Sequence, residues 1–392
     1  MTNVAIVGAG IAGPALAVAL REVGIDSLIL ERRPRRAPAV GAFLTLGTNG
    51  LIALSRLGLT GATVGFETGY IDLVSGTGKD LGRARITGPD GSPVSRTMRR
   101  ADLSALLRDK ALARGIEIRD QADVVAVHEA SDGVDVTLAD GTTLRADVLV
   151  GADGIWSRTR AVIDPAAPAP AYTGLTGHGG YAPAGVVADP PGSYRMIFGR
   201  AAFFGYAVAP DGGAWWFLNE PTPDEPRQSR TVERPPEALR AHLIALVAGD
   251  RGPAATMLDG TVEFTPSGPV HTIPHLPRWH TDRLVVIGDA AHAPSPSSGQ
   301  GASLALEDAV MLAARLRAHD TPREAFAAFT RARRPRVESI IRQAARVNSS
   351  KAATGIARVA RDLMLPLILR ATRSSPQLRD AYDYQVEALA AP

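Results

Sequence analysis

Residues 4–31 read VAIVGAGIAGPALAVALREVGIDSLILE, and this stretch decides the fold of the chain. Residues 4–7 form an apolar run of the kind found in buried parallel strands. Residues 15–23 are rich in Ala and Leu and predict a helix, which Gly24 ends. Residues 27–30 predict a second strand. A strand, a glycine-rich turn, a helix and a second strand together predict the βαβ unit that binds a dinucleotide.

Three glycines and one acid in this unit have separate predicted roles. Gly8 makes the tight turn, Gly10 lets the backbone approach a pyrophosphate, and Gly13 lets the helix pack closely on the strand. Free amides at the helix N-terminus attract the phosphates, and Glu31 is placed to accept hydrogen bonds from a ribose diol. Because Glu31 would repel a 2′-phosphate, Arg32 is interpreted as a solvated or adenine-flanking charge.

The composition limits the classes of protein to which the chain can belong. With 392 residues and 45% hydrophobic content, about two domains and a large core are expected. The net charge of +3 is small and no basic run alternates with aromatic residues, so nucleic-acid binding is not expected. The absence of cysteine excludes disulfides, thiolate catalysis and a cysteinyl-linked flavin. No stretch has the length of a transmembrane span and no basic leader precedes the apolar start, so a cytoplasmic protein is expected.

A second motif follows a predicted strand in the middle of the chain. Residues 151–160 read GADGIWSRTR and come directly after the apolar stretch 144–150. This order puts the carboxylate of Asp153 at the carboxyl end of a strand, where open α/β sheets hold their ligands. Taken alone, Asp153 and Gly154 fit a simple turn almost equally well.

A third motif repeats the logic of the first. Residues 284–303 read LVVIGDAAHAPSPSSGQGAS, which gives a buried strand, an acid at its end and a glycine-rich loop before a helix over 304–316. The acid, Asp289, suits sugar-like hydroxyls, and the amides around Gly299 favour negative charge above the helix start. His292 is interpreted as a structural residue of the turn, because no metal-ligand spacing surrounds it.

The region 165–272 is dense in proline and glycine and concentrates the aromatic residues of the chain. An aromatic strand face is usually ordinary core, but it can also form one wall of a pocket for a flat substrate. On the second reading Tyr206, Trp216 and Pro296 are candidate substrate contacts. Four polar residues of this region are interpreted as structural rather than catalytic: His178, Tyr181, Arg195 and Tyr206.

The remaining periodicity predicts further elements. The other strands are expected at 41–46, 70–74, 80–86, 117–119, 124–128, 134–138, 144–150, 194–199, 203–208 and 214–218. The other helices are expected at 49–57, 99–114, 235–247, 323–350 with an interruption at Pro335, and 355–371. The arginines of the last two helices are interpreted as a solvated face.

Taken together, the three motifs resemble those of the single-component FAD monooxygenases with the para-hydroxybenzoate hydroxylase fold. The resemblance rests on the first glycine motif with Glu31, on residues 151–160 and on GDAAHxxxPxxGxG at 288–301, and it covers nearly the whole chain. Arg100 also matches the arginine with which this family contacts the flavin ribose and pyrophosphate. The chain departs from the family at Ser303, where Asn is common. It is too short for the thioredoxin-like third domain of the phenol and polyketide hydroxylases, and its size is closer to the salicylate-hydroxylase-like and tetracycline-inactivating members.

The resemblance implies an α/β fold in which a mostly antiparallel β-sheet substrate domain interrupts a Rossmann-type FAD-binding domain, with helices at the C-terminus. The expected boundaries are 1–69, 99–171 and 273–330 for the FAD-binding domain, 70–98 and 172–272 for the substrate domain, and 331–392 for the C-terminal helices. The residues expected to bind FAD are Gly8, Gly10, Ile11, Ala12, Gly13, Glu31, Arg32, Arg100, Val124, Asp153, Gly154, Asp289, Pro296, Gly299, Gly301, Ala302 and Ser303.

The activity that the resemblance implies is insertion of one oxygen atom from O2 into an aromatic or polycyclic small molecule through a flavin C4a-hydroperoxide. Non-covalent FAD is the expected cofactor and NADPH or NADH the transient co-substrate, with antibiotic biosynthesis or resistance as a candidate setting. No metal is expected and no catalytic side chain is assigned. Two alternatives stay open: an FAD-dependent reductase of prenyl-type double bonds, and an FAD-binding redox sensor without turnover.

Overall fold

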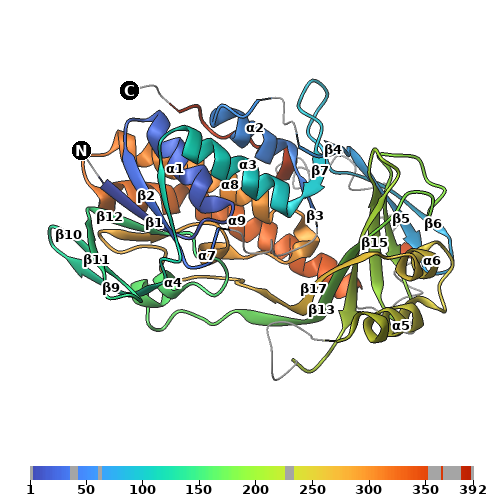
Figure 1. The fold of residues 1–392 in the computed structure, drawn as a ribbon. Helices are drawn as coiled ribbons and strands as arrows, with labels where there is room; N and C mark the ends of the chain where they lie inside the picture. The colour runs from blue at the N-terminus through green and yellow to red at the C-terminus, as the bar shows by residue number, and fades with distance from the viewer. Residues whose placement is uncertain are drawn as a thin grey trace.

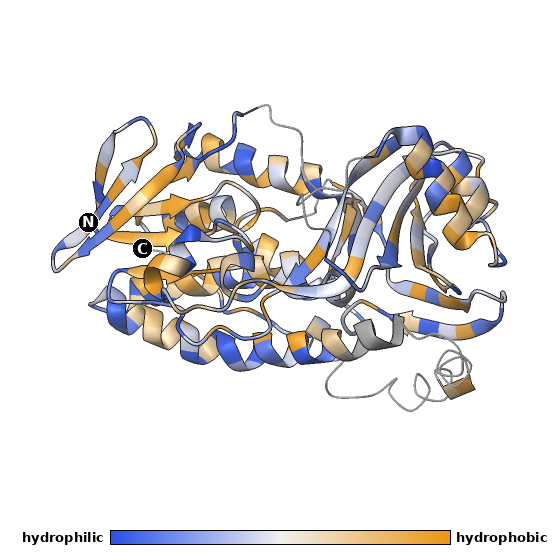
Figure 2. Ribbon diagram, turned by 90° about the horizontal axis from the view of Figure 1, so that it is seen from below, coloured by the Kyte–Doolittle hydropathy of each residue, from blue (hydrophilic) through white to orange (hydrophobic). Residues whose placement is uncertain are grey.

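The computed structural model describes residues 3–35, 43–60, 64–225, 234–351, 363–364 and 381–389. The chain forms two parts that lie side by side, a parallel sheet covered by helices and a larger, mainly antiparallel sheet (Figure 1). The strands of the parallel sheet are mostly hydrophobic, whereas hydrophobic and hydrophilic residues mix along the larger sheet (Figure 2). This difference is expected for a sheet covered on both faces beside a sheet with one more open face.

The parallel sheet has five strands in the order β18-β12-β1-β2-β8. Its strands are β1 (Asn3–Val7), β2 (Asp26–Glu31), β8 (Glu117–Asp120), β12 (Val148–Gly151) and β18 (Leu284–Val286). One face is covered by the helices α1 (Ala12–Glu22), α3 (Arg100–Ala113) and α8 (Gly301–Ala318). Against the other face lies a three-stranded antiparallel sheet of β9 (Val124–Ala130), β10 (Gly133–Leu138) and β11 (Thr143–Ala146).

The larger sheet has seven strands in the order β17-β13-β16-β15-β14-β5-β6, and only β14 and β5 run parallel. Its strands are β5 (Tyr70–Ser75), β6 (Asp80–Arg85), β13 (Ala171–Ala182), β14 (Tyr194–Phe198), β15 (Phe203–Val208), β16 (Ala214–Pro221) and β17 (Glu263–Thr272). The helices α5 (Pro236–Val247) and α6 (Ala254–Asp259) cover its outer face. Its inner face packs on a small sheet of β3 (Phe43–Leu46), β4 (Phe66–Glu67) and β7 (Arg96–Arg99).

The remaining elements surround the helix α8. They are α2 (Thr48–Arg56), α4 (Arg158–Ile163), α7 (Asp289–His292), a short 3-10 helix η1 (Pro296–Ser298) and α9 (Pro322–Lys351). None of the helices in the described ranges is long and apolar enough to cross a membrane.

The parallel sheet with its helices and the larger antiparallel sheet confirm the fold class predicted from the sequence. The strands of the larger sheet come from residues 70–85 and 171–272, and the domain boundaries stay a prediction.

The single strand predicted over 144–150 is wrong, because the chain forms two strands there in different sheets. β11 pairs with β10, and β12 pairs with β1 and β18. Asp147 separates them: its amide donates to the Asn3 carbonyl at 3.0 Å, and its carboxylate accepts from the Asn3 amide at 2.7 Å. These two bonds turn the chain from one sheet into the next.

Two strands and one helix of the middle region carry no signal that we recognised in the sequence. β13 contains several glycines and β17 contains two prolines, and their pairing is interrupted by register shifts. Both features weaken the alternating pattern by which strands are predicted. The short helix α6 was missed in the same region.

The predicted interruption at Pro335 is also wrong, because α9 continues through it as one helix. Pro335 is exposed on the surface of this helix. The arginines of α9 do not all form a solvated face, since Arg333 is fully buried and Arg336 is mostly buried. Most of the helix predicted at 355–371 lies outside the described residues, and only 363–364 are seen to be helical.

Arg333 lies between two acids at the centre of a buried network. Its guanidinium donates to Asp308 at 2.7 Å and to Glu307 at 2.6 Å, and none of these side chains is exposed. Glu307 also accepts from Arg336 at 2.7 Å and from Asn49 at 2.6 Å, so α2, α8 and α9 are joined. Burial opposes the ionisation of Asp308, but His292 and Arg333 outweigh it and lower the pKa of Asp308 to about 2.

We expect Arg333→Met to lower the free energy of unfolding by about 3–5 kcal/mol, because it removes the buried guanidinium that two buried carboxylates share. Urea denaturation of the variant beside wild type measures the change. The exposed Arg331, in the same helix, gives the matched control, since Arg331→Met removes the same charge from the surface. Equal stability of the two variants would contradict the structural role of Arg333.

Candidate cofactor and active site

All three sequence motifs lie at one edge of the parallel sheet. The carboxyl ends of four neighbouring strands, β18, β12, β1 and β2, lead into Asp289, Asp153, Gly8 and Glu31. The chain runs from β1 to β2 on one side and from the neighbouring strand β12 to β18 on the other side of the sheet. Such a switch point opens a crevice between the loops, and this is where open α/β sheets bind ligands.

The glycines of the first loop have the geometry that their predicted roles require. Gly8 has a φ of +106°, and a Cβ there would lie 2.4 Å from the Ala152 carbonyl oxygen. A Cβ on Gly13 would lie 1.9 Å from the Gly8 oxygen, so only glycine lets α1 pack this closely on the loop. A Cβ on Gly10 would meet nothing within 4 Å, which leaves open space beside the helix start.

The N-terminus of α1 points its free amides at this open space. Its N-cap residue Ile11 makes no side-chain hydrogen bond to the first turn, which begins at Ala12. Uncapped first-turn amides and the helix dipole together favour a bound phosphate.

Glu31 lies at the end of β2 with 9% of its surface exposed. One carboxylate oxygen accepts a hydrogen bond from the Ala9 amide at 2.7 Å, and the other accepts from the Arg33 amide at 2.9 Å. Glu31 therefore also holds the glycine-rich loop in place. Arg32 is exposed, and Val124 is buried at the start of β9, close to the segment that pairs with Glu31.

Arg100 is the first residue of α3 and is exposed at the helix start. One turn further along the same face, the Ser104 hydroxyl donates to the Gly10 carbonyl at 3.4 Å. Residues four apart on a helix are neighbours, so Arg100 lies beside the glycine-rich loop. Ser104 carried no signal in the sequence, because its contact depends on how α3 packs against α1.

The second motif is tied to the third by Arg160, its last residue. The buried guanidinium of Arg160 donates to the carbonyls of Ala290 at 3.0 Å and Ile155 at 2.8 Å. Asp153 accepts from the amide and the hydroxyl of Thr159, both at 3.1 Å, through one carboxylate oxygen. Its second carboxylate oxygen is buried and has no partner within the described part of the chain.

Asp308 holds the third motif in place through contacts with Gly288 and His292. Gly288 has a φ of +58° and its amide donates to Asp308 at 2.9 Å, while the His292 ring pairs with the same carboxylate at 2.6 Å. This geometry agrees with the interpretation of His292 as structural. Asp289 is half-buried, and no group in the described ranges donates a hydrogen bond to its carboxylate.

The helix α8 begins next to β3 and α2. Pro296 and Gly299 are exposed before it, Gly301 and Ala302 are half-buried, and its N-cap residue provides no side-chain cap. Ser303 is fully buried, and its hydroxyl accepts from the Gly47 amide at 3.2 Å. The Ser303 hydroxyl thus accepts from the protein backbone and can still donate its own proton, and its contact with FAD stays a prediction.

Asn49 and Gln300 were not singled out in the sequence. The Asn49 amide donates to Gln300 at 3.0 Å, and both side chains are buried between α2 and the start of α8. They extend the Arg333 network to the loop before α8.

The placement of Tyr206 and Trp216 does not fit the predicted substrate contact. Both side chains are fully buried between the larger sheet and the helices α5 and α6. Tyr206 bonds to Asp189, and the Trp216 ring donates to Thr261 at 2.9 Å. Alternate residues of a strand point to opposite faces. The residues next to Tyr206 and Trp216 in the chain, such as Trp215, therefore point to the inner face.

Three of the four polar residues interpreted as structural also point away from the inner face. His178 contacts Ser267 and Glu220, and Arg195 pairs with Asp189 at 2.7 Å. Hydrogen bonds from His178 and His242 hold the pKa of Glu220 at about 2, well below its usual value. Only Tyr181 lies on the inner face, where burial raises the pKa of its hydroxyl.

The inner face carries an aromatic cluster that links the two sheets. Phe43 of β3 packs against Trp215, Phe217 and Tyr194 with ring centres 6.0 to 6.2 Å apart. Tyr382, in the described segment 381–389, packs on the same cluster and lies against Gly47. The cluster therefore reaches the point where β3 meets the start of α8.

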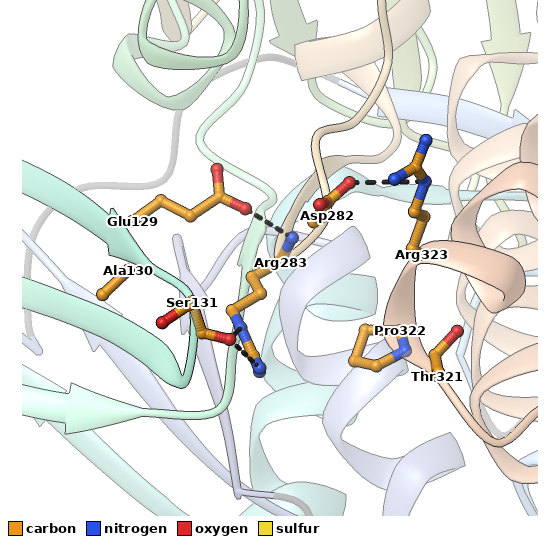
Figure 3. A pocket seen from close by; sticks show the side chains of 8 residues that line it. All are labelled: Glu129, Ala130, Ser131, Asp282, Arg283, Thr321, Pro322 and Arg323. Atoms are coloured by element: carbon orange, nitrogen blue, oxygen red, sulfur yellow. Dashed lines mark hydrogen bonds and ion pairs between the residues drawn. The ribbon is translucent and has the colours of Figure 1, made fainter.

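One surface hollow lies away from the three motifs. It is lined by Glu129, Ala130, Ser131, Asp282, Arg283, Thr321, Pro322 and Arg323 (Figure 3). Asp282 and Arg283 precede β18, so this hollow lies at the amino end of the strand, away from the three motifs. Its cations already have partners: the Arg283 guanidinium donates to the Ser131 carbonyl at 2.6 Å, and Arg323 pairs with Asp282 at 3.5 Å.

The residues at the strand ends fit a bound dinucleotide. Space is open beside Gly10, Gly154 and Gly299, the first turns of α1 and α8 carry uncapped amides, and one oxygen of Asp153 is buried without a partner. In the described ranges, no group of three or more His, Cys, Asp and Glu side chains is placed to hold a metal ion. A nucleotide cofactor held mainly by backbone groups suits this arrangement.

Comparison with known proteins identifies the cofactor class. The FAD binding domain family matches residues 1–344. The chain belongs to the FAD-dependent monooxygenases. It is 31% identical over 363 residues to an FAD-dependent urate hydroxylase of Mycolicibacterium vanbaalenii, covering 87% of each chain. It is 31% identical over 371 residues to a 3-amino-4-hydroxybenzoate 2-monooxygenase of Streptomyces cremeus, covering 88% of this chain and 86% of that one.

Solved structures of other flavoenzymes share the fold of this monooxygenase. The crystal structure of Klebsiella pneumoniae HpxO complexed with FAD and uric acid matches 97% of each chain with a TM-score of 0.82 at 21% identity. A salicylate hydroxylase substrate complex covers all of this chain and 98% of the other, with a TM-score of 0.78 at 21% identity.

We expect Gly10→Val to weaken FAD binding at least about tenfold while the apoprotein keeps its stability, because the added side chain fills open space rather than protein. Gly13→Ala should instead destabilise the apoprotein, since its Cβ overlaps the Gly8 carbonyl. Titration of apoprotein with FAD, followed by flavin fluorescence, and urea denaturation separate the two effects. Full FAD affinity in Gly10→Val would remove the first loop from the site.

Proposed function

We propose that this monooxygenase consumes NADPH or NADH and transfers one oxygen atom from O2 to an aromatic small molecule. The observation that carries the proposal is the position of the aromatic inner face, which meets the start of α8 through Phe43, Gly47 and Tyr382. A flat substrate on this face would lie next to the uncapped helix that resembles the flavin-binding helix of the family. The similar proteins named urate hydroxylase and 3-amino-4-hydroxybenzoate 2-monooxygenase act on flat rings by their names, which supports an aromatic substrate here.

The described residues divide the binding of FAD between backbone and side chains. Gly8, Gly10 and the start of α1 would hold the pyrophosphate, with Arg100 supplying a cation. Glu31 would accept the hydroxyls of the adenosine ribose, and Asp289 those of the ribityl chain. With no cysteine in the chain, the cofactor is held without a cysteinyl bond.

When bound, FAD would take a hydride from NADPH or NADH and activate O2 for transfer of one oxygen atom. The contribution of this chain is electrostatic and steric. The amides of Gly301, Ala302 and Ser303 at the start of α8 would stabilise negative charge on the ring. The aromatic cluster would exclude water from the reacting face.

Three further points belong to the proposal: the nicotinamide nucleotide, acid–base catalysis and the location of the protein. The strand-end motifs form one dinucleotide crevice, so the nicotinamide nucleotide would visit the protein only for the hydride transfer. No side chain is proposed as a general acid or base. A cytoplasmic location is part of the proposal and is tested by cell fractionation.

The proposal is tested by NADPH and NADH oxidation in air against a panel of phenols, aromatic acids, polycyclic antibiotics and isoprenoids. Substrate-stimulated oxidation with one 18O atom from 18O2 in the product is the expected result. Reduction of an isoprenoid double bond without oxygen uptake would indicate a prenyl reductase instead. Flavin that is reduced slowly and stimulated by no compound would indicate a redox sensor.

Asp289→Ala should lose most bound FAD and leave the fold intact, because its carboxylate is half-exposed and supports no hydrogen bond in the described chain. Gly301→Val should keep part of the FAD but displace the ring, since a Cβ there has ordinary contacts 3.7 Å or more from Pro294 and Asp289. Flavin content, reduction rate and peroxide yield compare the two variants with wild type. Full flavin and normal turnover in Asp289→Ala would show that the third motif is misassigned.

A further inference from the structure

Arg99 is a cation on the inner aromatic face that the motifs do not explain. It ends β7, where it pairs with Phe43 of β3, and so it shares the side of the small sheet that faces the aromatic cluster. Its guanidinium carbon lies 4.3 Å from the centre of the Tyr181 ring and 5.5 Å from that of Trp215. Arg99 therefore contacts the aromatic inner face, on which the proposed function places the substrate.

The guanidinium of Arg99 contacts rings but no acceptor. Within the described part of the chain, no carboxylate lies within 4.0 Å of it and no oxygen accepts a hydrogen bond from it. Asp102 and Glu263 are close enough to influence the Tyr181 hydroxyl, but neither pairs with Arg99. Guanidinium groups present five donors in a planar fork that matches a carboxylate, and a half-buried one without an acceptor is poised to receive an anion.

The arginines near Arg99 differ from it, because their guanidinium groups have acceptors. Arg96, on the same strand, donates to the carbonyls of Val64 and Gly65 at 3.3 and 2.7 Å. Arg195, on the larger sheet, is paired with Asp189. Among the described residues, the arginines beside Arg99 therefore have acceptors, whereas the donors of Arg99 have none.

We propose that Arg99 is a specificity-determining residue that binds the carboxylate or phenolate of an anionic aromatic substrate. The aromatic ring of such a substrate would pack on Trp215 and Phe217, and its anionic group would accept hydrogen bonds from the Arg99 guanidinium. This inference rests on the proposed function, because it assigns the charge of the substrate held on the inner face. It predicts that acids are bound more tightly than the corresponding neutral amides.

The test measures binding to the FAD-loaded protein without NADPH or NADH, so it does not depend on turnover. The probes are 2-, 3- and 4-hydroxybenzoate and the three matching hydroxybenzamides. Binding is followed by the visible spectrum of oxidised flavin and by tryptophan fluorescence. Trp215→Phe identifies the part of the fluorescence signal that comes from the inner face.

The variants are Arg99→Met, which removes the charge, and Arg99→Lys, which keeps the charge and loses the fork. Arg83→Met is the matched control, because Arg83 is paired with Asp72 at the exposed edge strand β6 of the larger sheet and its loss changes the net charge equally. Wild type should bind at least one acid about tenfold more tightly than its amide. Arg99→Met should abolish this preference with unchanged FAD content, Arg99→Lys should keep part of it, and Arg83→Met should keep all of it.

Three results would overturn the inference. They are equal or undetectable binding of every acid and its amide to wild type, an equal loss of both in Arg99→Met, and loss of FAD in that variant, which would assign Arg99 to the cofactor. If Arg99→Met does not fold, the acid preference of Arg99→Lys decides between the same outcomes. Absence of oxygen transfer in the turnover assay would refute the proposed function while leaving this binding result readable.

Discussion

The arrangement of the active site depends on one buried guanidinium, that of Arg333. It joins α9 to two consecutive acids of α8, and those acids hold the elements around the start of that helix. Asp308 receives the Gly288 amide and the His292 ring, and Glu307 receives Asn49 of α2. Buried ion pairs stabilise a protein only when their geometry compensates for desolvation. Here every acceptor oxygen of the two acids has a donor, and the result is a fixed position for the third motif.

The two proposed binding regions of this protein, one for the cofactor and one for the substrate, offer different kinds of groups. The strand ends offer mainly backbone: glycines without steric hindrance, helix amides and a few carboxylates. Such groups change little between members of a fold. The inner face of the larger sheet offers side chains, with rings from several strands and the guanidinium of Arg99, which has no acceptor within the described residues. Substrate choice can therefore change on this face while the cofactor crevice keeps its geometry.

Predictions from the sequence were accurate where the physical cause is local. The βαβ unit, the turn at Gly8, the close packing at Gly13 and the acids at strand ends all follow from neighbouring residues. Where a local sequence rule and a tertiary contact favoured different structures, the chain adopted the structure favoured by the tertiary contact. Asp147 divided a predicted strand through its two hydrogen bonds to Asn3, and α9 passed through Pro335 because that residue lies on the exposed side.

The sequence by itself determined the fold class, the three dinucleotide-binding motifs and the order in which they meet at one sheet edge. These depend on short-range patterns and on the rule that parallel strands end at a common edge. Only the tertiary structure decided which aromatic residues face the site, because adjacent residues such as Trp215 and Trp216 alternate between faces and the covered face is set by α5 and α6. It also decided that Arg333 is buried and that Arg99 has no acceptor among the described residues, since the partners of a charged side chain come from segments far away in the sequence.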